Sequence, residues 1–273
     1  MKTLNLFAAA ALAAGCLIAG AAAAHAQSAS ITATSPQLIM GFEVADDTTG
    51  TGANSDIELD LGYTAASLVA AANANGGTLV LGGTNFQTDL SANDLGATYG
   101  ADWATRTSGG GKLDWSIFGA NDNTDQFWVT SPTKFHLANS AQQAGFVDQV
   151  DFLYADLTGN TSTTHSNQDY IVTNASGDST SYYNAITQNA STSNWGYAEF
   201  TGNTETTVGT TTAIPFYSAP VGSTSAYATQ IGTFSLSNGG VLTFTATAVP
   251  EPSTWASIVL GAAGLIAYRR RRS

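Results

Sequence analysis

The stretch Gly232–Thr247, GTFSLSNGGVLTFTAT, decides the fold class. Two runs of alternating apolar and polar residues flank Asn238-Gly239-Gly240. Asn and Gly tolerate the positive φ angles of a tight hairpin turn, and alternation places the apolar side chains of a strand on one face. The stretch therefore predicts an antiparallel hairpin in which Phe234 and Leu236 face Leu242 and Phe244.

The remainder of residues 27–248 repeats this pattern, with Gly and Asn clusters between short apolar runs. Such spacing is typical of an all-β domain, and we expect an antiparallel β-sandwich or jelly roll. Two Ala-rich or Gln-rich segments, Ala65–Ala74 and Ala138–Val150, instead predict short helices. Further strands are expected at Gln37–Val44, Ser55–Leu61, Thr78–Leu81, Lys112–Phe118, Gln126–Thr130, Val150–Leu157, Tyr170–Thr173, Trp195–Phe200 and Ile214–Tyr217.

Ser55–Leu61, SDIELDL, has the most regular alternation among these strands. Apolar side chains occupy every second position, and the carboxylates of Asp56, Glu58 and Asp60 occupy the positions between them. A strand with this period of two presents its two sets of side chains to opposite sides of the sheet. We expect the three carboxylates to form a solvent-exposed face.

The charge of the body excludes one class of partner. Between residues 27 and 248 there are three cationic residues (Arg106, Lys112 and Lys134) and 19 carboxylates, which gives 3 − 19 = −16. No cationic patch is available to neutralise phosphates, so we do not expect binding to nucleic acid. The single cysteine, Cys16, lies in the N-terminal apolar run, so residues 27–248 contain no disulfide and no thiol nucleophile.

Residues 1–26 have the layout of a secretory signal peptide. Lys2 precedes an apolar run, and Ala24-His25-Ala26 forms a small-x-small cleavage site before Gln27. An uncleaved membrane anchor and a lipobox ending at Cys16 are the alternatives. The cleavage site argues against the anchor, and the apolar sequence after Cys16 argues against the lipobox.

The other end of the chain, residues 249–273, predicts a short transmembrane helix over residues 253–268. The 14 residues from Trp255 to Tyr268 would span about 21 Å as a helix, which is short of a hydrocarbon core of about 30 Å. Interfacial rings at both ends and snorkelling arginines extend this reach. The Arg cluster Arg269, Arg270, Arg271 and Arg272 orients the C-terminus towards the cytoplasm, and the body outside.

Val249, Pro250, Glu251 and Pro252, the apolar helix and the terminal Arg cluster together resemble the PEP-CTERM sorting signal. The resemblance implies a protein that is exported through the inner membrane, transiently anchored there by its C-terminal helix, and processed by an exosortase near the motif. It then implies release to the cell surface or the extracellular space, in a host that often makes exopolysaccharide. Four body segments, of which Leu113–Asn121 is one, are similar to ectodomains of this class that have no assigned activity.

Candidates for chemistry in the body are sparse. Apart from His25 the histidines are His136 and His165, and no serine-hydrolase motif accompanies them. Asp148 and Asp151 are spaced for one helical face, as a glycosidase carboxylate pair could be.

Asp122 and Asp125, in the segment NDNTD, are weak candidates for binding calcium. The segment lacks the Gly of an EF-hand loop, and an Asn/Asp turn capped by its own side chains explains it equally well. We therefore expect no cofactor, with calcium as the alternative.

Several tryptophans could instead stack on sugars: Trp103, Trp115, Trp128 and Trp195. We accordingly expect a non-enzymatic envelope or extracellular-matrix component. A carbohydrate-binding module acting on exopolysaccharide is the first alternative, and a secreted hydrolase is the second.

Overall fold

The computed structural model describes residues 37–44, 55–81, 95–106, 111–124, 126–135, 140–159, 171–175, 182, 186, 206–208, 213–219 and 226–247. Both terminal segments lie outside these ranges, as does the strand expected at Trp195–Phe200. Within the described residues, no helix combines the length and apolar character needed to cross a membrane.

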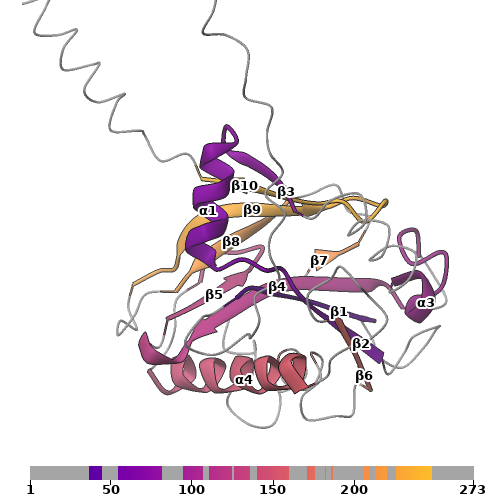
Figure 1. Cartoon of the computed structure of the whole chain (residues 1–273), viewed down its shortest axis with the longest axis horizontal. Helices are drawn as coiled ribbons and strands as arrows, with labels where there is room; N and C mark the ends of the chain where they lie inside the picture. The colour runs from indigo at the N-terminus through magenta and orange to yellow at the C-terminus, as the bar shows by residue number, and fades with distance from the viewer. Residues whose placement is uncertain are drawn as a thin grey trace, which may run out of the picture.

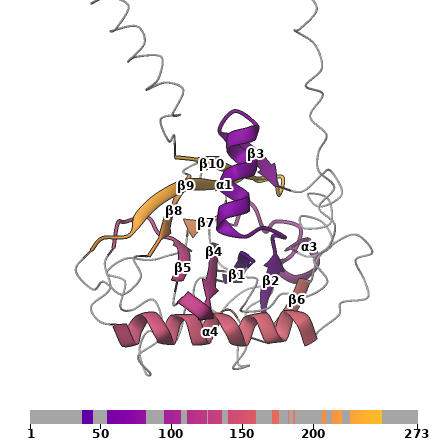
Figure 2. The same ribbon diagram turned by 60° about the vertical axis from the view of Figure 1, so that its left-hand side comes forward.

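All ten strands of the described residues join one antiparallel sheet, in the order β3-β10-β9-β8-β5-β4-β1-β2-β6, with β7 pairing to β4. The sheet curls into a half-barrel (Figures 1 and 2). The strands are β1 (Ile39–Val44), β2 (Ser55–Asp60), β3 (Thr78–Leu81), β4 (Leu113–Asn121), β5 (Gln126–Thr130), β6 (Ile171–Ala175), β7 (Thr206–Thr207), β8 (Ile214–Ser218), β9 (Thr229–Leu236) and β10 (Leu242–Ala246).

The antiparallel β class is thus confirmed, but the expected sandwich or jelly roll is replaced by this single curled sheet. Among the described residues, helices and not a second sheet pack on its two faces. The helical elements are α1 (Ala65–Ala74), α3 (Gly96–Tyr99), the short 3-10 turn η2 (Asp122–Thr124) and α4 (Ser140–Gly159). α1 packs near β3 and β10, and α4 lies across β4 and β5 at the opposite end of the molecule (Figures 1 and 2).

The hairpin of β9 and β10 forms as its sequence predicts. Phe234 pairs directly with Phe244, and Gly240 adopts a φ of 77° in the turn. Phe216 from β8 joins these two rings, with its centroid 5.1 Å from that of Phe234. This aromatic cluster belongs to the larger of two buried apolar cores.

α1 also occupies the range expected from the sequence, and its two ends explain why. Thr64 Oγ1 accepts from the N–H of Ser67, while Ser67 Oγ accepts from the N–H of Thr64. This reciprocal capping box satisfies two donors at the helix start. Asn75 caps the other end by donating from Nδ2 to Ala71 O at 2.8 Å.

The strand expected at Val150–Leu157 is wrong, because these residues belong to α4. Their buried side chains follow a helical period with spacings of three and four, not the period of two that a strand requires. Phe152 is 53% exposed, although the strand hypothesis placed it among alternating apolar positions. The buried stripe consists of Phe146, Val147, Val150, Leu153, Tyr154 and Leu157.

Candidate functional site

The carboxylates of β2 do not face solvent, contrary to the sequence prediction. Asp56, Glu58 and Asp60 are 0%, 1% and 3% exposed. They lie on the side of the sheet that α4 covers, and Glu43 of β1 is buried near them. The alternation correctly assigned the side chains of β2 to its two faces. It could not indicate that other segments of the chain bury the acidic face.

Tyr182 is one of the residues that pack over the carboxylate face of β2. Its ring lies so close to Gly41 that a Cβ at this glycine would stand 2.3 Å from Tyr182 Cδ2. The Tyr182 N–H donates to Glu58 Oε1 at 2.6 Å, and its hydroxyl lies 2.6 Å from Ser116 Oγ. Because Gly41 pairs with Glu58 on one side and with Ser116 on the other, the tyrosine spans three adjacent strands.

Tyr99 approaches the same strands from α3. Its hydroxyl lies 3.0 Å from the carbonyl oxygens of Phe42 and Ser55, and it donates its proton to this pair. Burial, followed by the charges of nearby Asp56, Glu58 and Glu43, raises the pKa of Tyr99 well above its usual value. Tyr99 therefore stays protonated and acts as a hydrogen-bond donor that joins β1 to β2, not as a base.

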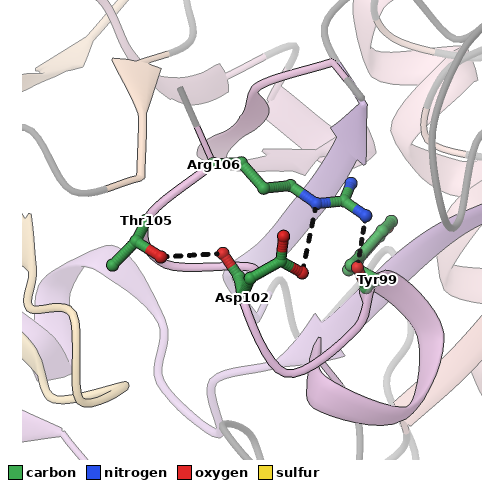
Figure 3. A network of polar contacts seen from close by, with 4 residues as sticks. All are labelled: Tyr99, Asp102, Thr105 and Arg106. Atoms are coloured by element: carbon green, nitrogen blue, oxygen red, sulfur yellow. Dashed lines mark hydrogen bonds and ion pairs between the residues drawn. The ribbon is translucent and has the colours of Figure 1, made fainter. Parts of the chain in front are cut away.

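Arg106 holds the loop after α3 (Figure 3). Its guanidinium donates to Tyr99 O, and its Nε lies 3.8 Å from Asp102 Oδ1. The Arg106 side chain is 6% exposed, whereas that of Asp102 is 72% exposed. An ion pair with one partner in solvent adds little stability, so the carbonyl contact and packing are the main contributions of Arg106.

Asp114 of β4 lies at the margin of this acidic region. It pairs directly with Glu43 of β1 and with Thr207 of β7. Burial raises the pKa of Asp114, and this effect is partly offset by the hydrogen bond from Thr207 and the charge of Lys112. The folded protein thus holds the Asp114 proton more tightly than the unfolded chain does.

Asp114→Asn is therefore expected to raise the free energy of unfolding at pH 7 by about 1 kcal/mol, the scale of a poorly solvated buried polar group. A raised carboxyl pKa costs stability above that pKa, and the cost fades as the pH falls towards the ordinary value of 3.8. Urea unfolding from pH 4 to pH 7 measures this, and the variant's advantage should grow with pH. An advantage independent of pH would contradict the assignment.

The tryptophans and histidines that the sequence analysis singled out are either buried, half-buried or outside the described residues. Trp103 and Trp115 are 5% and 2% exposed, so neither can stack on a sugar, while Trp128 is half-buried. Trp195, His136 and His165 lie outside the described residues. Burial of two tryptophans removes much of the evidence for a carbohydrate-binding face.

The segment that contains the calcium candidates is described only in part. Asn121 Oδ1 accepts from the N–H of Asn123 at 3.1 Å, which is a side-chain-capped turn. Asp125 and the side chain of Asp122 are not described. Among residues that are, no group of three or more His, Cys, Asp or Glu side chains could hold a metal ion. Calcium binding by this segment stays a prediction.

Asp148 and Asp151 do line one surface hollow of about 310 Å³, together with Gly145, Gln149 and Phe152. All five residues belong to α4, so the described lining comes from one helix surface. Asp148 is exposed and Asp151 is half-buried. No described element places a second group opposite them, as a glycosidase would require across a scissile bond.

Sequence reasoning missed Tyr182, Tyr99 and Gly41. Tyr182 lies in a polar stretch, STSYYNAI, with no local pattern that predicts a buried cover. Gly41 gave a weak signal, because a glycine inside an apolar strand often marks a close approach of another group.

The sorting-signal residues begin three residues after the end of the last strand. β10 ends at Ala246, Thr247 is the last residue described, and Pro250 comes three residues later. The motif residues 249–252, the anchor residues Trp255, Tyr268 and Arg269–Arg272, and the cleavage residues Ala24, Ala26 and Gln27 all lie outside the described ranges. The body therefore presents the signal directly from the end of an inner strand of its sheet.

The C-terminal signal places the protein in the class of exported, surface-sorted proteins. A family model described as the PEP-CTERM protein-sorting motif matches residues 248–272, which confirms the identification of a PEP-CTERM exosortase substrate. The motif implies an exosortase as the processing partner and export across the inner membrane. Neither the curated proteins nor the solved structures contained a match to the chain.

Proposed function

We propose that the protein is a non-enzymatic component of the cell envelope or extracellular matrix, delivered by exosortase processing. The sorting motif at residues 248–272 is the observation that carries this proposal. In it, residues 1–26 direct export, residues 253–268 hold the chain transiently in the inner membrane, and cleavage near Pro250–Pro252 releases the body.

The described body supports a structural role. Two carboxylates of β2 are committed to internal contacts: Glu58 accepts from the N–H of Tyr182, and Asp60 accepts from the N–H of Gly62. Buried carboxylates that are hydrogen-bonded in this way fix the positions of strands and loops and offer no open base. The net acidic body would also remain soluble after release.

Pro250→Ala together with Pro252→Ala tests the proposal. We expect the variant to be exported but to remain in the membrane fraction at full C-terminal length, because the enzyme no longer recognises the motif. Fractionation followed by mass spectrometry measures this. The melting temperature of the body serves as the control, and it should not change because both prolines follow the last strand. A variant that matures and reaches the surface like the wild type would contradict the proposal.

A further inference from the structure

The charges of this protein are segregated along the chain. Residues 61–88 and 206–250 contain no Asp, Glu, Lys, Arg or His. These two ranges include α1, β3 and the strands β7 to β10. The charged residues of the body come from the segments before residue 61 and between residues 89 and 205, which include β1, β2, β4 and α4.

The fold brings the two uncharged ranges together. β3 pairs with β10, β10 pairs with β9, and α1 packs against both β3 and β10. In both views, α1, β3 and β10 lie at the end of the molecule opposite α4 (Figures 1 and 2). α4 contributes Asp148 and Asp151 to the other end.

We call the uncharged surface at the α1 end the neutral end. It includes the end of α1, the Gly76-Gly77 turn and the adjoining strand termini. Its exposed residues are Asn73, Ala74, Asn75, Gly76, Thr78, Thr245 and Thr247. Backbone hydrogen bonds show that the chain leaves the sheet here: Ala246 N–H donates to Gly77 O at 2.9 Å, and Thr247 N–H donates to Ile231 O at 3.0 Å.

The connection from this surface to the membrane is short. Pro250 lies three residues after Thr247, so a fully extended chain places it at most about 11 Å away. Trp255, at the start of the apolar segment, lies eight residues after Thr247 and at most about 29 Å away. The interfacial layer of a bilayer takes up about 5–8 Å of that distance on each side. An enzyme that reads Pro250 must therefore reach within about 11 Å of Thr247, which belongs to the neutral end.

We propose that the neutral end is the surface on which the exosortase's extracytoplasmic side docks while it reads the motif. This inference rests on the proposed function. Protein interfaces are depleted of charge at their cores, and a surface of Thr, Asn and Gly costs no charge desolvation when it is covered. The exposed residues described there include no Lys, Arg or aromatic side chain of the kind that binds lipid surfaces, which favours a protein partner over the bilayer itself. In this arrangement the α4 end, which carries Asp148 and Asp151, points away from anionic lipids.

Charged residues introduced on the neutral end test whether it is a docking surface. The chosen positions are far from the motif in sequence and are brought near it by the fold. Ala74→Glu with Thr78→Glu is expected to slow C-terminal processing in cells by about fivefold or more, which corresponds to about 1 kcal/mol of lost interaction. Ala144→Glu with Thr124→Glu, two exposed positions at the α4 end, is the matched control and should change the rate less than about twofold. Equal rates for the two double variants would overturn the proposal.

A photo-crosslinking residue at position 74, in an otherwise unchanged chain, provides an independent measurement should the charged variant fold poorly. We expect an adduct with the exosortase at position 74 and none at position 144. Adducts with lipid alone at position 74 would overturn the proposal in favour of a bilayer contact. The Pro250→Ala, Pro252→Ala variant distinguishes failure of the proposed function from failure of the docking proposal. If this variant is still processed, the proposed function fails. If it is not processed but the charge and crosslinking results are negative, only the docking proposal fails.

Discussion

Gly232→Ala is expected to destabilise the body by about 3 kcal/mol, the upper range for overpacking a close-packed core. A Cβ at Gly232 would lie 2.3 Å from the ring carbons Cε2 and Cζ of Phe244 and 2.7 Å from Thr245 O. The ring cannot swing aside freely, because it packs 4.8 Å from the Phe234 ring and also contacts Phe216. The backbone oxygen belongs to β10 itself, so relief would require the two strands to separate.

Thermal unfolding measures this effect, and a loss of about 3 kcal/mol corresponds to a fall in melting temperature of roughly 10 °C for a domain of this size. Gly76→Ala is the matched control. No atom lies within 4 Å of a Cβ at Gly76, so its cost comes only from a backbone φ of +76° and should be about 1 kcal/mol. Equal losses for the two variants would show that Phe244 does not pack against Gly232 as described.

Gly41→Ala is the second substitution with a large expected effect, again about 2–3 kcal/mol. The added methyl group would occupy the position of the Tyr182 ring, with contacts of 2.3–2.5 Å. Tyr182 is held by Glu58, by Ser116 and by stacking on Phe118 at 5.7 Å between centroids. Displacing the ring therefore breaks contacts to two strands and exposes the buried acidic region.

A double-mutant cycle isolates this clash. In the Tyr182→Ala background the ring is gone, so Gly41→Ala should cost less than about 1 kcal/mol, and the two substitutions should show a coupling of about 2 kcal/mol. Urea unfolding of the four proteins gives the cycle. Additive losses would mean that Tyr182 does not lie over Gly41, and the buried acidic face would then lack the cover assigned to it.

Local patterns predicted the elements whose hydrophobic period and whose turn or cap residues lie within the stretch itself. The alternation of β9 and β10 around Asn238-Gly239-Gly240, and the Ala-rich stretch of α1 before Asn75-Gly76-Gly77, each carry their start, period and end in the sequence. The range of β5, Gln126–Thr130, was predicted in full for the same reason.

The sequence did not indicate which faces of these elements other segments of the chain would bury. α4 has buried residues at helical spacing, but the shorter run from Val150 to Leu157 also permits a strand, and only packing against β4 and β5 decides between them. The carboxylates of β2 lie on the face that alternation assigned to them, yet α4 and Tyr182 bury that face. For the same reason the sequence predicted two facing sheets where one curled sheet is covered by helices.

The same distinction applies to the candidate site: the part that is contiguous in sequence could be predicted, and the part that depends on tertiary packing could not. The sorting signal was recognisable because its three parts are contiguous in sequence and resemble a known motif: the Pro-Glu-Pro residues, an apolar segment and a terminal Arg cluster. The neutral end was not predictable, because it joins α1 and β3 to β10 across more than half of the chain, through strand pairing that no local pattern specifies.

The intact mass of the protein recovered from the surface or medium of its own cells tests the central claim most directly, because one spectrum reports both termini. The account predicts a chain that starts at Gln27 and has lost the apolar helix together with Arg269–Arg272. A surface protein that still carries residues 249–273 in full would contradict it.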